Sequence, residues 1–349
     1  MIKINGKEIK MGMKPYIIAE IGANHNGDMS LAKNMIKEAK RCGADAVKFQ
    51  SWTPSSLISK EEYDNNQVYT DSPKKHFGSL KDMVQKYYLR DEQHFELKKY
   101  CDSLEIDFCS TPFSKGEVDL LIKLNIPFIK VASMDINNLE LLKYIAKTKK
   151  TVILSTGMST IGEIEKAIET IEGEGNSQII LLHCISIYPP KYDDINLNNI
   201  PMLEKTFGYP VGFSDHTIGI SIPLASVVLG SCIIEKHFTL DKSMPGWDHE
   251  ISADPDELEI ICNESQNIVK SLGSFRRIVS KDESEKLKKF RRSVVLERNV
   301  KAGEILKLED LDFKRPGTGI KPDEIKYILE RKVVRNIEKD EILKWEDIK

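Results

Sequence analysis

Two histidines in the middle of the chain, His216 and His237, have the spacing that points most directly to chemistry. Each follows a short apolar run, and the stretch between the runs is long enough for one helix. Such a strand–helix–strand unit brings both strand ends to the same edge of a parallel sheet. Two imidazoles that meet there predict a metal site with open positions for water and substrate oxygens, which suits Mn²⁺, Co²⁺ or Fe²⁺ better than a closed zinc site. The alternative is that one histidine only hydrogen-bonds.

Two lysines, Lys48 and Lys130, lie within otherwise apolar strands. A buried ammonium group is costly unless an anion pairs with it. A single lysine or serine at a strand end is usually a satisfied surface group, but here the lysines occur with several hydroxyls and a Ser-Thr-Gly turn at residues 155–157. The combination predicts a pocket for a phosphorylated or carboxylated ligand.

Further polar side chains follow the predicted strands, where barrel enzymes carry their reactive groups. They are Glu20, Gln50, Thr111, Ser133, Asp135, Ser155, Tyr188, Ser214 and Asp248. Among the other histidines, His183 follows the apolar run IILL and is expected to line the core, whereas His76 and His94 are expected at the surface.

The elements that must position these residues alternate between apolar strands and amphipathic helices. The predicted strands end near Gly22, Gln50, Ser110, Val131, Leu154, His183, Phe213 and Ile234. Eight strands over about 270 residues indicate a (β/α)₈ TIM barrel. A hairpin around Asn5-Gly6 is expected to cover one end of it. The polar, weakly periodic stretch Ser51–Tyr88 interrupts the alternation and is expected to form substrate loops.

The sequence changes character after the barrel pattern. We expect a catalytic domain at residues 1–280, a charge-rich linker at 281–292 and a small β-rich domain at 293–349, whose size requires packing on the barrel or on another subunit. The linker is interpreted as a solvated segment and not as a nucleic-acid site, because it lacks aromatic platforms.

Composition excludes several classes of protein. The chain has 40% hydrophobic and 30% charged residues with a net charge of −3, which argues against nucleic acid or a membrane as its partner. No apolar run approaches the roughly 20 residues that span a bilayer. The six cysteines form no CxxC pair, and no secretory signal is visible, so a cytoplasmic location is expected.

Nine short motifs, in one order along nearly the whole chain, resemble the sialic acid synthase family. They are AEIGANHNG, ADAVKFQ, STPF, KVAS, LSTGM, YPP, GFSDHT, EKHFTLD and KRPGTGI. The resemblance implies a transferase that condenses phosphoenolpyruvate with an N-acetylated amino sugar such as N-acetylmannosamine and releases phosphate. It also implies that the C-terminal domain is antifreeze-like (SAF) and that the protein is a domain-swapped homodimer.

The resemblance carries roles to individual positions. It implies that His216 and His237 hold a divalent metal, Mn²⁺ with Co²⁺ or Mg²⁺ as alternatives, and that Arg315 reaches the sugar site of a partner subunit. It assigns phosphoenolpyruvate to Lys48, Thr111, Lys130, Ser133, Ser155 and Ser214. It assigns the sugar to Glu20, Gln50, Tyr188 and Asp248. Glu20 or Asp135 would activate or orient the attacking water, while the metal polarises the sugar aldehyde.

One departure leaves the acceptor sugar open. Sialic acid synthases usually carry Gly-Glu after the serine of the fourth strand, where this chain has Met134-Asp135. A legionaminic or pseudaminic acid synthase, acting on a 2,4-diacetamido-2,4,6-trideoxyhexose, is therefore the alternative. Two further readings are a metal-dependent sugar-acid aldolase, which would release no phosphate, and a non-catalytic sugar-binding barrel.

Overall fold

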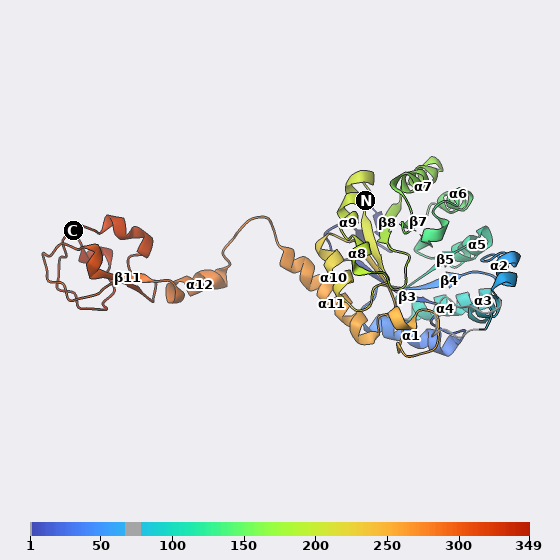
Figure 1. Cartoon of the computed structure of the whole chain (residues 1–349), viewed down its shortest axis with the longest axis horizontal. Coiled ribbons are helices and arrows are strands. Elements are labelled where there is room, and N and C mark those ends of the chain that lie inside the picture. Colours follow the sequence, from blue (N-terminus) through green and yellow to red (C-terminus); the bar gives the residue numbers. More distant parts are fainter. Residues whose placement is uncertain (1, 67–77) are drawn as a thin grey trace. The chain divides into compact units, whose positions relative to one another are not determined.

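The computed structural model describes residues 2–66 and 78–349 of the chain. It separates into two compact units, Met1–Gly273 and Ser274–Lys349. We describe each unit by itself, with the first unit carrying the residues predicted to do chemistry (Figure 1).

Eight parallel strands of the described residues form the first unit. They are β3 (Tyr16–Gly22), β4 (Ala46–Ser51), β5 (Asp107–Pro112), β6 (Phe128–Val131), β7 (Thr151–Ser155), β8 (Ile179–Cys184), β9 (Val211–Asp215) and β10 (Ile233–His237). Their hydrogen-bonded order is β5-β4-β3-β10-β9-β8-β7-β6, and the outer strands β5 and β6 are also in contact. The sheet is thus a nearly closed barrel, which confirms the predicted fold.

Both faces of the strands are covered, which explains their continuous apolar sequences. Inside the barrel, residues such as Ile18, Phe128 and Ile180 form one buried cluster, and a larger cluster fills the layer between the sheet and the helices. The N-terminal strands β1 (Ile2–Ile4) and β2 (Lys7–Ile9) pair antiparallel around Asn5-Gly6, as predicted. Their isoleucines join the inner cluster. Since Tyr16 and Phe128, each the first residue of its strand, belong to the same cluster, the hairpin closes the amino-terminal end of the barrel and leaves the carboxyl end for the site.

Helices cover the outer face of the barrel. They are α1 (Met29–Arg41), α4 (Asp91–Ser103), α5 (Lys115–Lys123), α6 (Leu139–Lys147), α7 (Ile161–Gly173), α8 (Tyr192–Ile195), α9 (Asn199–Phe207), α10 (Ser221–Val228) and α11 (Pro255–Leu272). Several begin at side-chain caps that satisfy free backbone N–H groups, including a capping box between Thr160 and Glu163 in α7. The strongly amphipathic α1 buries Ala32, Met35, Ile36 and Ala39 against the sheet.

The long excursion after β4 is more ordered than its sequence suggested. It contains α2 (Lys60–Asn65) and α3 (Leu80–Tyr87). The expectation of weak periodicity was wrong for α3, because Leu80, Met83, Val84 and Tyr87 follow the helical i, i+3, i+4, i+7 pattern and are buried. They form a separate apolar cluster with Trp52. The predicted surface residue His76 lies outside the described residues.

The C-terminal unit has few regular strands. It has α12 (Lys281–Phe290), two paired strands, β11 (Ser293–Leu296) and β12 (Leu311–Lys314), and three short 3₁₀ turns at Leu308–Asp310, Pro322–Tyr327 and Trp345–Asp347. The other extended segments meet only through single bridges such as Val300 with Ile337. Gly303, with φ +89°, and Asp340, with φ +65°, interrupt them with turns, so long ladders cannot form.

An internal duplication organises this unit. Residues 298–310 (RNVKAGEILKLED) and 335–347 (RNIEKDEILKWED) repeat the same pattern. Arg298 Nε donates to Asp310 at 2.6 Å, and Arg335 Nε donates to Asp347 at 2.7 Å. Val300 and Ile337 exchange both backbone hydrogen bonds, which places a pseudo-twofold axis between the repeats.

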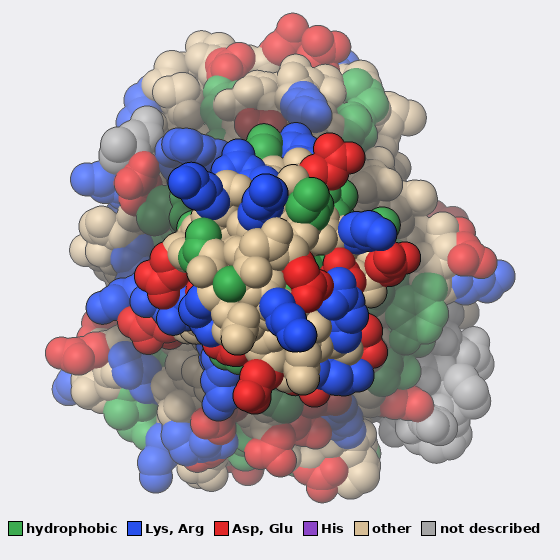
Figure 2. Space-filling model, turned by 90° about the vertical axis from the view of Figure 1, so that its left-hand side faces the viewer, with side chains coloured by type: hydrophobic (Ala, Val, Ile, Leu, Met, Phe, Trp, Pro, Cys, Tyr) green, Lys and Arg blue, Asp and Glu red, His purple; other side chains and the backbone are tan. Residues whose placement is uncertain are grey.

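Figure 2 shows Lys and Arg side chains interleaved with Asp and Glu over the face of the molecule that it presents.

None of the helices in the described part of the chain is long and apolar enough to cross a membrane.

Candidate functional site

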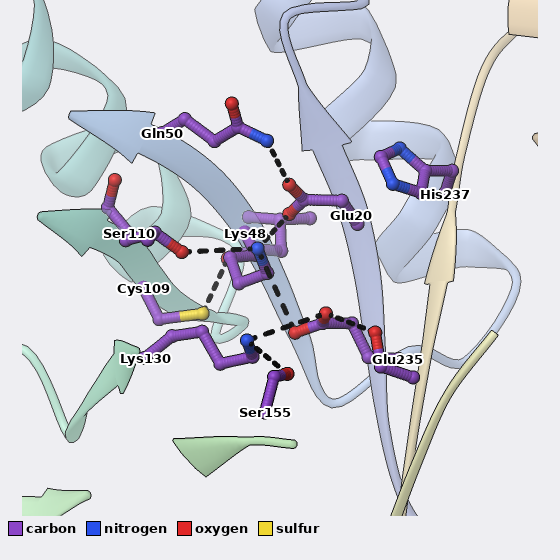
Figure 3. Close-up of polar contacts among 12 residues, drawn as sticks. Glu20, Lys48, Gln50, Cys109, Ser110, Lys130, Ser155, Glu235 and His237 are labelled. Atoms are coloured by element: carbon purple, nitrogen blue, oxygen red, sulfur yellow. Dashed lines mark hydrogen bonds and ion pairs between the residues drawn. The ribbon is translucent and has the colours of Figure 1, made fainter. Parts of the chain in front are cut away.

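Two lysines and two glutamates meet inside the carboxyl end of the barrel (Figure 3). Lys48 of β4 places its Nζ 2.8 Å from Glu20 Oε2 of β3 and 3.8 Å from Glu235 Oε2 of β10. Lys130 of β6 places its Nζ 3.9 Å from Glu235 Oε1. All four side chains are buried. The prediction that each buried lysine requires an anion nearby is thus met by carboxylates of the protein itself. One of them, Glu235, lies at a predicted strand end but had no predicted role.

Burial and the neighbouring charges set the proton affinities of the two glutamates in opposite directions. Burial raises the pKa of Glu20 to about 7, with Lys48 opposing that rise and Glu235 adding to it. Burial also acts to raise the pKa of Glu235, but Lys130, Lys48 and the Ser214 hydroxyl outweigh it and hold the pKa below its ordinary value. Burial lowers the pKa of the Lys130 ammonium. A carboxyl group with a pKa near neutrality is suited to exchange a proton during a reaction.

Hydroxyl groups surround the lysines. Ser155 Oγ accepts a hydrogen bond from Lys130 Nζ at 2.7 Å, and Thr111 Oγ1 accepts one from Lys48 Nζ at 3.3 Å. Ser133 Oγ accepts one from the Gly157 N–H at 3.0 Å, and Ser214 Oγ donates to Glu235 at 2.8 Å. The ends of β4, β5, β6, β7 and β9 therefore contribute to one polar pocket.

Gly157 allows two strand ends to approach closely. A Cβ atom at this position would lie 2.8 Å from Ser133 Oγ and would collide with Ser186 Oγ. The absence of a side chain lets the Gly157 N–H donate to Ser133 Oγ and leaves room for both hydroxyls. Backbone N–H groups, hydroxyls and ammonium groups together are the donor set that binds phosphate or carboxylate.

The two predicted imidazoles lie together at the rim. The His216 and His237 ring centroids are 5.5 Å apart, and both side chains are buried. His216 Nδ1 donates to the Ile185 carbonyl oxygen at 2.7 Å, which leaves its Nε2 without a proton in the neutral ring. Burial lowers the pKa of His216, so the neutral form prevails at neutral pH.

These features fit a metal held by two imidazoles. An imidazole whose other nitrogen donates to a backbone carbonyl is the usual orientation of a histidine ligand. No group of three or more His, Cys, Asp or Glu residues suited to an ion occurs within residues 2–66 and 78–349. Two histidines alone would leave coordination positions open to water and substrate.

Three of the residues assigned to the sugar lie next to these groups. Gln50 Nε2 donates to Glu20 Oε1 at 3.0 Å. The Tyr188 ring centroid lies 4.0 Å from that of His216, and Asp248 Oδ2 lies 3.7 Å from His237 Nδ1. Asn24 Oδ1 accepts the Asp248 N–H at 3.1 Å and so fixes the loop after β10. Gln50, Tyr188 and Asp248 thus border the space between the charged pocket and the imidazoles.

Two predicted residues occupy other surroundings. Asp135 lies in the 3₁₀ turn Ser133–Asp135, where Asn138 Nδ2 donates to Oδ1 at 3.3 Å and burial raises the pKa of the carboxyl group. Arg315 belongs to the C-terminal unit, where its guanidinium carbon lies 5.3 Å from the Phe290 ring centroid.

His94 was predicted at the surface, and this was wrong. Its Nε2 lies 2.7 Å from Ser51 Oγ, whose oxygen is in turn 2.6 Å from Ser110 Oγ, and its Nδ1 donates to the Arg90 carbonyl oxygen at 3.0 Å. The three side chains are fully buried. Ser51 follows Gln50 on β4, and Ser110 precedes Thr111 on β5. The hydrogen bonds from His94 through these two serines therefore connect α4 to the strand ends that carry Gln50 and Thr111. His183 is buried, as predicted, and its Nε2 donates a hydrogen bond to the Ile195 carbonyl oxygen.

Comparison with known proteins gives consistent matches along the chain. The family model described as "NeuB family" matches residues 35–277, and that of the SAF domain matches residues 291–349. An uncharacterized protein of Methanocaldococcus jannaschii is 46% identical over 99% of this chain and 98% of its own length. The N,N'-diacetyllegionaminic acid synthase of Legionella pneumophila is 40% identical, with 99% of this chain and 98% of that protein covered. The crystal structure of an N-acetylneuraminic acid (sialic acid) synthetase from Leptospira borgpetersenii in complex with citrate aligns with a TM-score of 0.73 and 34% identity, covering 82% of this chain and 94% of that one.

Proposed function

This chain belongs to the NeuB family of nonulosonic acid synthases and ends in a SAF domain, and from this membership we propose that it condenses phosphoenolpyruvate with an N-acetylated amino sugar. The reaction joins C3 of phosphoenolpyruvate to the aldehyde carbon of the open-chain sugar and adds water at C2. Cleavage of the C2–O bond then releases phosphate and leaves a 2-keto acid.

The observation that carries the proposal is the buried pocket of Lys48 and Lys130 with its hydroxyls. Glu20 and Glu235 already pair with the two ammonium groups, but the lysines and the hydroxyls beside them remain a donor set of the kind that binds anions. Phosphoenolpyruvate carries a phosphate and a carboxylate on the same carbon, C2, and would engage both lysines. Lys130 with Ser155, Ser133 and the Gly157 N–H provides donors for the phosphate. Lys48 with Thr111 provides donors for the carboxylate. Held in this way, the enol carbon is oriented toward the rim.

Glu20 is the residue proposed to handle protons. Its pKa of about 7 makes both protonation states accessible near neutrality, and its carboxylate already contacts Lys48 and Gln50. In the ionised form it would accept a proton from the water that adds to C2. Asp135 is the alternative, and its half-buried carboxyl group lies two residues beyond Ser133 on the loop after β6.

His216 and His237 are proposed to hold a divalent metal, Mn²⁺ first, with Co²⁺ or Mg²⁺ as alternatives. A metal at this position would polarise the sugar aldehyde oxygen as a Lewis acid. The contact from His216 to Ile185 supports the assignment, because it turns the unprotonated Nε2 away from the backbone. Tyr188 restricts the same ring from the other side.

The acceptor that we favour is a 2,4-diacetamido-2,4,6-trideoxyhexose, ahead of N-acetylmannosamine. Two observations support this choice. The legionaminic acid synthase is 40% identical to this chain, against 34% for the solved sialic acid synthetase. The loops after β6 and β7 also carry the exposed Met134 and Met158, 61% and 71% accessible, which are apolar partners for methyl and acetamido groups. Tyr188, Asp248 and Gln50 would contact the sugar.

A homodimer in which Arg315 reaches the sugar site of the other subunit is part of the proposal. The first residues of the C-terminal unit support it, since Phe275, Ile278 and Val279 are exposed within a short stretch. Exposed apolar clusters of this kind are typical of contact surfaces. Size-exclusion chromatography with light scattering tests the dimer, and a monomer at working concentrations would contradict it.

The experiment that tests the function supplies phosphoenolpyruvate, Mn²⁺ and a panel of N-acetylated hexoses to the full-length protein. We expect phosphate release that depends on one acceptor and a product heavier than that acceptor by C₃H₄O₃. The largest kcat/KM should belong to the diacetamido sugar. A preference for N-acetylmannosamine would overturn the choice of acceptor, and cleavage of a sugar acid without phosphoenolpyruvate would replace the synthase with an aldolase.

A further inference from the structure

A fully buried ion pair lies behind the two rim histidines, on the outer side of the sheet. Lys236 of β10 places its Nζ 2.7 Å from Asp215 Oδ2 of β9, and the two residues are directly paired in the register of these strands. Neither side chain is measurably exposed, at 0% for both. Asp215 immediately precedes His216, and Lys236 immediately precedes His237.

Thr217 completes this arrangement. Its backbone N–H donates to Asp215 Oδ1 at 2.9 Å, and its hydroxyl donates to Asp215 Oδ2 at 3.1 Å. Lys236 Nζ donates to the Thr217 carbonyl oxygen. The residues on either side of His216 are therefore bound to each other and to the neighbouring strand, so the backbone that carries this imidazole has little freedom.

The alternation of side chains along β10 places His237 on the opposite face of the sheet from Lys236. Successive residues of a strand point to opposite faces, so Glu235 and His237 face the interior while Lys236 faces outward. Figure 3 shows Glu235 and His237 on the inner side, toward the charged pocket. Any change in the pairing of Lys236 with Asp215 would shift the ends of β9 and β10 relative to each other, and both imidazoles with them.

Stability alone does not explain a pair of this kind. Removing two charges from water costs several kcal/mol per ion, and well-packed apolar residues of the same size are commonly as stable or more stable. The apolar cluster between the sheet and the helices includes Phe213, Ile234 and Phe238, each two residues from Asp215 or Lys236 in sequence. What the pair provides, and an apolar pair would not, is one fixed geometry for the two strand ends.

We propose that Asp215 and Lys236 are positioning residues that hold His216 and His237 at the separation required to bind a divalent metal together. The inference rests on the proposed function, because it takes the two histidines to be metal ligands. Partners that hydrogen-bond to the ligands of a metal typically change its affinity by 10–100-fold when they are replaced, and we expect a change of that order for Asp215 and Lys236, which act through the backbone.

The test measures Mn²⁺ binding to the metal-free, full-length protein by electron paramagnetic resonance, with no substrate present. The double variant D215N/K236M removes both charges with little change in volume and keeps an oxygen that can accept from the Thr217 N–H. We expect its Kd for Mn²⁺ to rise about 10–100-fold while its thermal midpoint stays close to that of wild type. T217V, which loses only the hydroxyl, should show a smaller rise.

The matched control is K98M/D102N, which makes the same two replacements at the exposed pair on α4, where the Lys98 and Asp102 groups are 2.6 Å apart. It should leave the Kd unchanged. Wild-type affinity in a folded D215N/K236M variant would overturn the inference. If D215N/K236M does not fold, T217V provides the test instead. An unchanged Kd for Mn²⁺ in T217V would count against the proposal.

Two further measurements separate this inference from the proposed function. Mn²⁺ binding that is lost in H216Q, combined with no consumption of phosphoenolpyruvate by wild type, would reject the reaction and leave the inference standing. Condensation by wild type, combined with unchanged Mn²⁺ affinity in D215N/K236M, would reject the inference and leave the reaction standing.

Discussion

Glu20 and Lys48 face each other across neighbouring strands, with the Lys48 Nζ 2.8 Å from the Glu20 Oε2 deep inside the barrel. The contact explains why Glu20 retains a usable charge despite complete burial. Burial alone favours the neutral acid, whereas the ammonium group stabilises the carboxylate, and the result is a pKa of about 7.

The first prediction concerns the pH dependence of the reaction. Because Glu20 is proposed to accept a proton, its ionised form is the active one, and kcat/KM should rise as the pH increases through about 7. E20Q should be slower and should lack this rise. A wild-type profile that is flat between about pH 6 and 8, or one that E20Q leaves unchanged, would contradict the role of Glu20.

The second prediction concerns the anion pocket. K130M removes the ammonium group that contacts Ser155, and the loss of a charged hydrogen bond typically costs 1.5–3 kcal/mol, or about 10–100-fold in Kd. Calorimetry should therefore show weaker phosphoenolpyruvate binding by about this factor. K123M changes an exposed lysine at the end of α5 and should bind as wild type does. Equal affinities in the two variants would place the anion elsewhere.

The third prediction uses the close approach at Gly157. In G157A the new methyl group would displace the Ser133 and Ser186 hydroxyls, so the KM for phosphoenolpyruvate should rise strongly while the fold is retained. G162A is the control, because a Cβ there meets nothing within 4 Å and Ala is favoured over Gly in a helix. A G157A protein with the wild-type KM would show that this turn does not contact the substrate.

The fourth prediction concerns stability in acid. Burial, together with the nearby His94, lowers the pKa of His25 to about 4, and burial also lowers that of His94. A depressed folded-state pKa means that the stabilising contribution is complete above the unfolded value of about 6.5 and is lost as the pH falls toward 4. For His25 the loss amounts to about 3 kcal/mol.

Urea unfolding at about pH 7.5 and pH 5 measures this effect. Glu20, whose pKa is raised, contributes with the opposite sign between about pH 4.5 and 7, so the informative comparison is between wild type and H25N. Asn at this position can still accept the Gly27 N–H that His25 Nδ1 accepts. The variant should lose less stability between the two pH values than wild type, and equal losses would contradict the prediction.

The sequence predicted the barrel well because its strands are buried on both faces and therefore read as continuous apolar runs. The inward polar residues of the pocket were also predictable, since Lys48 and Lys130 stand out within such runs. Polar residues outside the pocket were not predictable in this way. His94 belongs to a helix of ordinary polar composition, and only the fold shows that it meets Ser51 and Ser110.

The interaction partners of the charged residues could not be predicted from the sequence either. Glu235 and Lys236 are adjacent in sequence, yet Glu235 joins the pocket and Lys236 binds Asp215 behind the sheet. Period-two alternation separates them onto opposite faces, but the identity of each partner depends on strand register, which the sequence alone does not define.

The most direct test of the central claim follows both substrates and both products in one reaction. Purified full-length protein is incubated with Mn²⁺, phosphoenolpyruvate and the 2,4-diacetamido-2,4,6-trideoxyhexose, and the mixture is analysed by ³¹P NMR and mass spectrometry. We predict that phosphoenolpyruvate and sugar disappear in equal amounts, that phosphate appears in the same amount, and that the sole new acid exceeds the sugar by C₃H₄O₃. Phosphate release without loss of any acceptor sugar, or no consumption of phosphoenolpyruvate with any N-acetylated hexose, would contradict it.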